Sequence, residues 1–344
     1  MVFLWHPKSA GMPSGIHEEA IMTSASRIQA PGRAPAEHMV WVPGGTFLMG
    51  SQDFYPEERP VRRVEVDGFW MDDHPVTVAE FRRFVKATRY VTVAERPLDP
   101  AQYPGADPAL LRPGSLVFHQ TARPVDLRDV SQWWRYTPGA QWRHPQGPGS
   151  TLAGLDDHPV THVAAEDAEA YAAWAGRELP SEAEWEFAAR GGLRGAAFCW
   201  GDEFAPGGVM MANTWQGQFP WQNLQTDGWA RTSPVKSFPA NGHGLFDMAG
   251  NVWEWTSDYF VTGPGRVQHA CCVPRNPRVT SAEASLVPGE PGAHIPRRVI
   301  KGGSHLCAPN YCLRYRPAAR QGEAIDTSTS HLGFRCIVRA AKKE

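Results

Sequence analysis

The sequence predicts a single loop-rich α+β domain, with small twisted antiparallel sheets and a few packed helices. First, 33 Gly and 31 Pro in 344 residues indicate many turns and loops. Second, the periodic stretches are short and predict few regular helices, which argues against a helical bundle or a doubly wound sheet. Third, 42% hydrophobic residues and 14 Trp are enough to form a large core.

Composition and charge limit the classes of function. Residues 1–38 are rich in Ser, Pro, Gly and Ala, so we expect a disordered leader there and a folded domain over residues 39–340. The formal net charge of −2 gives no electrostatic footprint for nucleic acid, so we expect no nucleic-acid partner. No window approaches the roughly 18 apolar residues that span a bilayer, and we expect no membrane association.

The cysteine count and the first residues bear on the cellular compartment. Six cysteines in so long a chain are too few for the disulfide scaffold of a small secreted protein. The short apolar start is broken by His6, Pro7 and Lys8, unlike the plan of a secretory signal. We therefore expect a cytoplasmic protein whose cysteines are mostly reduced.

The first periodic stretches predict strands and one helix. Residues 39–51 alternate on both sides of Gly44 and Gly45, which predicts a short hairpin. Residues 62–69 alternate again and predict another strand. Thr77 followed by Glu80 forms a capping-box pattern, so a helix is expected to start there. Its buried stripe would be formed by Phe81, Phe84 and Val85.

Two further helices are predicted in the middle of the chain. The pentapeptide DHPVT at residues 73–77 recurs at 157–161, ahead of a helical pattern over about 165–175. Ser181 and Glu184 form a second capping box, and Gly191 is placed to end that helix. Residues 95–150 and 265–298 lack clear periodicity and are expected to be long ordered loops, because Trp133 and Trp134 need burial.

The most informative feature is a pair of cysteines, Cys307 and Cys312, followed by Arg314, Arg316 and Arg320. Cationic neighbours favour the thiolate, so we expect depressed pKa values for both thiols. The thiolate is both the nucleophile and the metal ligand of cysteine chemistry. A structural disulfide, or two buried thiols that act as small hydrophobic residues, is the alternative interpretation.

Six segments together resemble the formylglycine-generating enzymes, also called sulfatase-modifying factors. They are WVPGGTFLMGS, DHPVTHVAAEDAEAYAAWAGRELPSEAEWEFAARGG, ANTWQGQFPWQNLQTDGW, NGHGLFDMAGNVWEWTSDYF, KGGSHLCAPNYCLRYRPAAR and SHLGFRC. The resemblance implies a variant of the C-type-lectin-like fold over residues 39–340. It also implies oxidation of the cysteine in a C-x-P-x-R segment of an unfolded sulfatase to Cα-formylglycine, with O2 and a thiol reductant.

The resemblance to copper-dependent members places Cu(I) between the thiolates of Cys307 and Cys312. Cu(I) is a soft ion, and thiolates are the ligands that it prefers. The substrate thiolate would then bind as a third sulfur ligand. An older interpretation of the family gives Cys312 a mixed disulfide with the substrate and gives Cys307 the oxygen chemistry. The sequence does not choose between the two.

Further site residues follow from the resemblance, position by position. Ser304, Tyr311 and Trp253 match residues that line the substrate cleft, with ordinary packing as the alternative. Arg316 and Arg320 are expected to bind or shape the substrate site, with structural ion pairs as the alternative. His331 stands where many relatives have Asn, so we expect an altered substrate preference.

Two structural calcium sites are also implied, because oxygen ligands from loops suit Ca²⁺. One set comprises Asn213, Thr214, Asp227 and Trp229. The other comprises Asp247, Gly250, Val252 and Glu254. Turn and capping hydrogen bonds are the alternative role of these polar groups.

Two other classes compete with this interpretation. An ergothioneine-type sulfoxide synthase needs histidines on an added helical domain, and no H-x3-H-x-E pattern occurs. A non-catalytic lectin-like binding or maturation accessory module of the same superfamily lacks the cysteine pair. Cys199, Cys271 and Cys272 are assigned to loop packing, although Cys272-Val273-Pro274 begins a client-like motif with Asn276 in place of Arg. Cys336 has no inherited disulfide partner.

Overall fold

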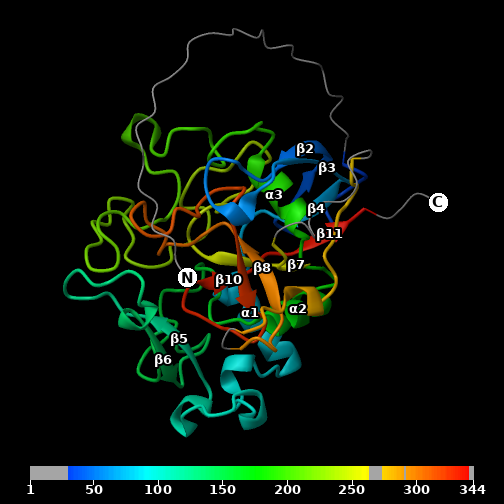
Figure 1. The fold of residues 1–344 in the computed structure, drawn as a ribbon. Helices are drawn as coiled ribbons and strands as arrows, with labels where there is room; N and C mark the ends of the chain where they lie inside the picture. The colour runs from blue at the N-terminus through cyan, green and yellow to red at the C-terminus, as the bar shows by residue number, and fades with distance from the viewer. Residues whose placement is uncertain (1–29, 263–272, 290–291, 341–344) are drawn as a thin grey trace.

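The computed structural model describes residues 30–262, 273–289 and 292–340, and structural statements refer to these (Figure 1). Three α-helices lie in this part of the chain: α1 (Val78–Thr88), α2 (Ala165–Trp174) and α3 (Glu182–Arg190). The strands are short: β1 (Met39–Val42), β2 (Gly45–Met49), β3 (Arg62–Val66), β4 (Phe69–Asp72), β5 (Gly114–Phe118), β6 (Trp134–Pro138), β7 (Trp253–Tyr259), β8 (Arg297–Lys301), β9 (Arg320–Ala324), β10 (Leu332–Gly333) and β11 (Ile337–Arg339). The predicted loop-rich α+β class is confirmed.

The described strands form small separate sheets. The orders are β1-β4-β11, β10-β7-β8-β9, β2-β3 and β5-β6. Pairing is antiparallel throughout these sheets except between β10 and β7, which run parallel. Figure 1 shows the β5–β6 hairpin at one end of the molecule, and β2, β3 and α3 at the other. No helix of the described residues is long and apolar enough to cross a membrane.

The hairpin predicted across Gly44 and Gly45 is wrong. β1 pairs with β4 and β2 pairs with β3, and the register Val42↔Phe69 continues as Gly45↔Val66. Residues 39–49 therefore continue without a reversal, and they pair with residues 62–72 in one long two-stranded ribbon. Gly44 has a φ of +69°, and a Cβ there would lie 2.5 Å from the backbone N of Gly68. The glycine pair thus allows a close approach of two chains, where we had expected a reversal.

The predicted helices are confirmed with their caps. Thr77 Oγ1 accepts a hydrogen bond from Glu80 N at 3.2 Å, and Glu80 Oε2 accepts one from Thr77 N at 2.8 Å, so both members of the capping box are made at α1. Ser181 and Glu184 do the same at α3. That helix ends at Gly191, whose φ of 56° is left-handed.

The two DHPVT pentapeptides lie side by side and pair with each other. Val160 N donates to Val76 O at 2.9 Å, and Val78 N donates to His158 O at 2.9 Å. Thr77 and Pro159 form an antiparallel bridge. The repetition in the sequence is therefore a contact in the fold, which joins the start of α1 to the segment ahead of α2.

Residues 95–150 hold more regular structure than expected, because β5 and β6 form a hairpin there. Trp133 is fully buried, as its size requires. It packs in a small aromatic cluster with Trp215, Phe219 and Leu306, separate from the main core. The predicted loop 265–298 is only partly described, and Cys271 and Cys272 lie outside the described residues. So do residues 1–29 of the expected leader; residues 30–38 are irregular.

Candidate active site

A cavity of about 850 Å³ lies beside the aromatic cluster and contains most of the predicted site. Six residues that the sequence singled out line it together: Trp253, Ser304, Cys307, Tyr311, Cys312 and His331. Trp253 begins β7, and His331 precedes β10, which pairs with β7. The other four lie on the irregular segment between β8 and β9. The cavity therefore unites residues from separate motifs.

Tight turns place the two cysteines side by side. Cys307 N donates to Ser304 O at 2.9 Å, and Cys312 N donates to Ala308 O at 2.9 Å. Gly303 has a φ of +68°, and a Cβ there would lie 2.8 Å from the backbone of Arg314. The chain thus folds back so that Gly303 meets Arg314, and only glycine at position 303 permits so close a contact.

The Sγ atoms of Cys307 and Cys312 are 3.0 Å apart, and both side chains are buried. A disulfide bond is about 2.05 Å long, so the two sulfurs form a hydrogen-bonded pair of free cysteines. The hydrogen bond from Cys307, helped by the Arg314 guanidinium, lowers the pKa of Cys312 to about 7. Burial raises the pKa of Cys307 well above its usual range. Of the two sulfurs, Cys312 is therefore the one that loses its proton more readily.

This corrects the expectation that both thiols have depressed pKa values. Burial outweighs the nearby positive charge at Cys307. Only one of the three arginines lies near the sulfurs: Arg314 Nη1 is 4.0 Å from Cys312 Sγ. Its Nη2 pairs with Glu57 Oε1 at 2.6 Å, and its guanidinium lies 3.8 Å from the centroid of the Tyr55 ring.

Arg316 and Arg320 are not among the residues that line the cavity, and their ion pairs agree with the alternative interpretation as structural partners, so a role at the substrate site stays a prediction. Arg316 is fully buried and forms a two-pronged ion pair with Glu58. Arg320 Nε pairs with Glu182 Oε1 at 2.6 Å, and both side chains are buried. Buried charges need a paired, hydrogen-bonded partner, so these arginines hold the fold around the site.

Several lining residues were missed because they lie far away in the sequence. Tyr55, Glu57, Leu116 and Trp134 contribute to the cavity from segments without a recognisable motif, and Phe219 contributes from one of the resembling segments, where no site role was predicted for it. The one available signal was the need to bury the Trp133-Trp134 pair, which pointed to an ordered region without placing it at the site.

Aromatic and imidazole rings shape the cavity. The Tyr311 and Phe219 rings stack with centroids 4.4 Å apart. The Trp134 and His331 rings lie 4.8 Å apart, and His331 Nδ1 is 2.5 Å from Thr329 Oγ1. Burial lowers the pKa of His331 well below its usual range, so it presents a neutral ring. Its predicted effect on substrate preference stays a prediction.

One observation supports cation binding by the first proposed calcium set. The Oδ1 atom of Asn213 is buried and accepts no hydrogen bond from any described residue. A buried oxygen without a donor is costly, and a cation would satisfy it. The Asp227 carboxylate accepts from the backbone N of Thr214 and of Trp229, at 3.1 and 2.9 Å. Burial raises its pKa.

The second proposed calcium set fits less well. The Glu254 carboxylate already accepts hydrogen bonds at 2.8 Å from Trp185 Nε1 and from two nitrogens of Arg335. Arg335 is fully buried and balances its charge. The Asp247 carboxylate has more capacity to bind a cation, because among the described residues its Oδ1 receives only a 3.5 Å contact from Asn251. Burial raises the pKa of Asp247 to about 6.

Comparison with known proteins shows the family to which the chain belongs. The sequence profile of the Sulfatase-modifying factor enzyme 1-like domain matches residues 24–340. The chain therefore belongs to the sulfatase-modifying factor family. A relative named formylglycine-generating enzyme, from Mycobacterium tuberculosis, is 55% identical over 304 residues, which cover 87% of this chain and 97% of the relative.

Two further similarities show the range of the fold. A mouse relative named inactive C-alpha-formylglycine-generating enzyme 2 is 36% identical over 331 residues, covering 93% of this chain and 92% of the relative. The structure of PvdO from Pseudomonas aeruginosa matches with a TM-score of 0.57 and 23% identity, over 88% of this chain and 94% of that one. The latter likeness supports the fold alone.

Proposed function

We propose that this protein oxidises the cysteine of a C-x-P-x-R segment in an unfolded sulfatase to Cα-formylglycine, with O2 and a thiol reductant. The observation that carries the proposal is the pair of free sulfurs, 3.0 Å apart, on the wall of a cavity. Family membership and the Mycobacterium tuberculosis relative support the same activity.

Cys307 and Cys312 are the residues that would hold Cu(I). Two buried soft donors suit this ion better than oxygen ligands do. When bound, Cu(I) would supply an open position for the substrate sulfur and reactivity toward O2. The hydrogen bond from Cys307, helped by Arg314, lowers the pKa of Cys312, whereas Cys307 must lose its proton to become a ligand. The N–H of Ser304 points to Cys307 Sγ at 3.4 Å and would stabilise its negative charge.

The lowered pKa of Cys312 also bears on the alternative route through a mixed disulfide. The thiolate is the attacking form of cysteine, so Cys312 would be the residue that attacks a substrate disulfide or is joined to the substrate. This matches the role that the older interpretation gives to Cys312. The two routes differ in whether peptide conversion requires copper.

The cavity supports an extended, unfolded client. A volume of about 850 Å³ holds several residues of a peptide, and seven separate stretches of the chain line it. Trp134, Phe219, Tyr311 and Trp253 offer apolar surface for a proline, while Glu57 and Arg314 offer charged groups. A folded segment would not bring its cysteine to buried sulfurs.

A peptide assay tests the proposal. A C-x-P-x-R peptide, incubated in air with Cu(I)-loaded protein and a thiol reductant, should lose one sulfur and two hydrogens and gain one oxygen by mass spectrometry. A peptide with Ser in place of Cys is the matched control. If the peptide stays unchanged while the protein binds copper, the protein is a non-catalytic module like the inactive mouse relative.

The proposal extends to structural calcium and to a cytoplasmic location. Calcium at the first set is supported by the unsatisfied Asn213 Oδ1, and at the second set by the spare capacity of Asp247. Isothermal titration should give two equivalents of Ca²⁺, with one lost in Asp227→Ala and the other in Asp247→Ala. All four described cysteines are free, which suits a reducing compartment.

A further inference from the structure

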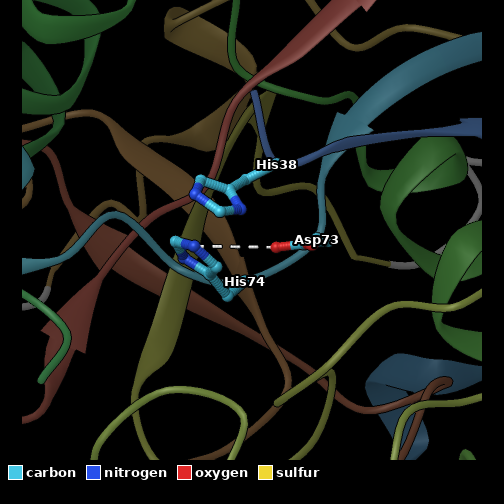
Figure 2. A group of neighbouring side chains, drawn as sticks. All are labelled: His38, Asp73 and His74. Atoms are coloured by element: carbon cyan, nitrogen blue, oxygen red, sulfur yellow. Dashed lines mark ion pairs between the residues drawn. The ribbon is translucent and has the colours of Figure 1, made fainter. Parts of the chain in front are cut away.

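A second group of metal-ligating side chains lies where β1 begins and β4 ends, apart from the residues that line the cavity. His38, Asp73 and His74 each offer one ligand atom, and these atoms all lie within 4.8 Å of one another. Figure 2 shows the two imidazole rings facing each other, with the Asp73 carboxylate beside His74. The sequence analysis did not single out this group.

The backbone fixes the positions of these residues. The β1–β4 ladder ends with Met39 opposite Asp72, so His38 and Asp73 are the next facing pair. Asp73 N donates to His38 O at 2.7 Å, and Phe246 N donates to Asp73 O at 2.8 Å. The ligand atoms are therefore held by strand pairing, and binding an ion would require little reordering of the chain.

His74 presents an unprotonated nitrogen to the group. Its Nδ1 lies 2.9 Å from the carbonyl oxygen of Pro75, so Nδ1 carries the hydrogen and donates it. Nε2 is then left with a lone pair in the neutral ring. A backbone carbonyl that holds the other ring nitrogen is the usual arrangement around a metal-bound histidine.

The Asp73 carboxylate faces that lone pair. Its Oδ1 is 3.6 Å from His74 Nε2, is buried, and accepts no hydrogen bond from the described part of the chain. Its Oδ2 is paired with Lys236 Nζ at 2.8 Å. The Asp73 Oδ1 atom is thus a buried oxygen without a hydrogen-bond donor, and a cation between it and His74 Nε2 would satisfy both atoms.

We propose that His38, Asp73 and His74 form a binding site for a divalent transition-metal ion, with Zn²⁺ as the ion that best suits two imidazoles and one carboxylate. His38 is exposed, so a water molecule can complete the coordination. The ion would join the start of β1 to the end of β4. It would be a structural ion, distinct from any metal held by the cysteine pair.

Cobalt titration tests this site. Co²⁺ is added to the Cys307→Ser/Cys312→Ser protein, so that the cysteine pair does not compete, and visible absorption follows binding. We expect one equivalent of Co²⁺, displaced by Zn²⁺, without the intense near-ultraviolet absorption that thiolate ligands produce. His38→Ala in the same background should weaken binding at least about tenfold. His294→Ala, which removes another exposed histidine, is the matched control and should bind normally.

The outcomes separate clearly. Because His38 is exposed, its replacement leaves the fold intact, which circular dichroism verifies. A second readout is the melting temperature, which Zn²⁺ should raise in the background protein and not in His38→Ala. The proposal is overturned if no Co²⁺ binds, if His38→Ala binds as tightly as its parent, or if thiolate absorption shows that other cysteines hold the ion.

Discussion

The cavity has two kinds of wall, and they differ in how the chain supplies them. The cysteine wall comprises Ser304, Leu306, Cys307, Tyr311, Cys312 and Arg314, all within one short segment. The long-range wall comprises Tyr55, Glu57, Leu116, Trp134 and Phe219, from four separate segments. In the proposed function the cysteine wall would supply the reacting sulfurs, while the long-range wall shapes the cavity and pairs with Arg314 through Glu57. The residues proposed to react can thus lie close together in the sequence, while the residues that surround them come from distant segments.

Residues 54–58 connect the two walls by several contacts. Leu313 N donates to the Tyr55 hydroxyl oxygen at 3.0 Å, and Glu57 pairs with Arg314. Glu58 pairs with Arg316, whose guanidinium lies 3.6 Å from the centroid of the Phe54 ring. The long-range wall therefore holds the cysteine segment in place from outside.

The largest expected effect comes from the cysteine wall itself. Cys312→Ser keeps the shape of the side chain and removes the thiolate, so conversion of a C-x-P-x-R peptide should fall at least about a thousandfold. Mass spectrometry of the peptide measures the rate. Cys199→Ala removes a buried cysteine outside this cavity and should retain the activity of a folded protein. Full turnover by Cys312→Ser would refute the assignment.

The next effect tests the connection between the walls. Glu58→Gln leaves the buried Arg316 without its counter-charge, so the free energy of unfolding should fall by about 3–5 kcal/mol. Urea unfolding followed by fluorescence gives this value. Asp126→Asn breaks an exposed pair with Arg128 and should change little. Equal effects of the two variants would mean that the buried pair has no special role.

A smaller effect concerns the positive charge that Arg314 of the cysteine wall places beside the Cys312 thiolate. In the metal-free protein, alkylation of Cys312 by iodoacetamide should increase as pH rises through about 7, because the thiolate reacts. Arg314→Met removes a cation, raises the pKa of Cys312, and should slow alkylation at pH 7 by about fivefold for the first pKa unit and about tenfold for each further unit. Peptide mapping locates the label.

Arg128→Met, which removes an exposed arginine, is the control for that experiment. Its alkylation profile should match the unmodified protein. A profile for Arg314→Met that is also unchanged would show that the hydrogen bond from Cys307 suffices to hold the thiolate.

The smallest effect comes from a single hydrogen bond between the walls. Tyr55→Phe leaves Leu313 N without its acceptor and should lower the free energy of unfolding by about 1 kcal/mol. It should also raise KM for the peptide more than it lowers kcat, since Tyr55 lines the cavity. Tyr136→Phe removes a hydroxyl that donates to Arg112 O outside the cavity, so it is the control for the measurement of KM.

The sequence predicted what local rules govern. Capping boxes fixed α1 and α3, because their hydrogen bonds lie within four residues. The cysteine pair was evident from its spacing. The sequence did not predict the path of residues 39–49, because a glycine pair serves a turn or a close approach equally well. Nor did it predict Tyr55 and Glu57 at the site, since only the folded chain brings them to Arg314.

The paired pentapeptides have a further consequence. Two copies of one short sequence meet antiparallel about the facing residues Val76 and Val160, as two identical subunits do in an isologous dimer. The chain thus contains a small interface with approximate two-fold symmetry. A substitution in one copy disturbs the match between the two copies, so the effects of changing Val76 and Val160 on the free energy of unfolding should be non-additive. The double variant should lose less stability than the sum of the losses in the two single variants.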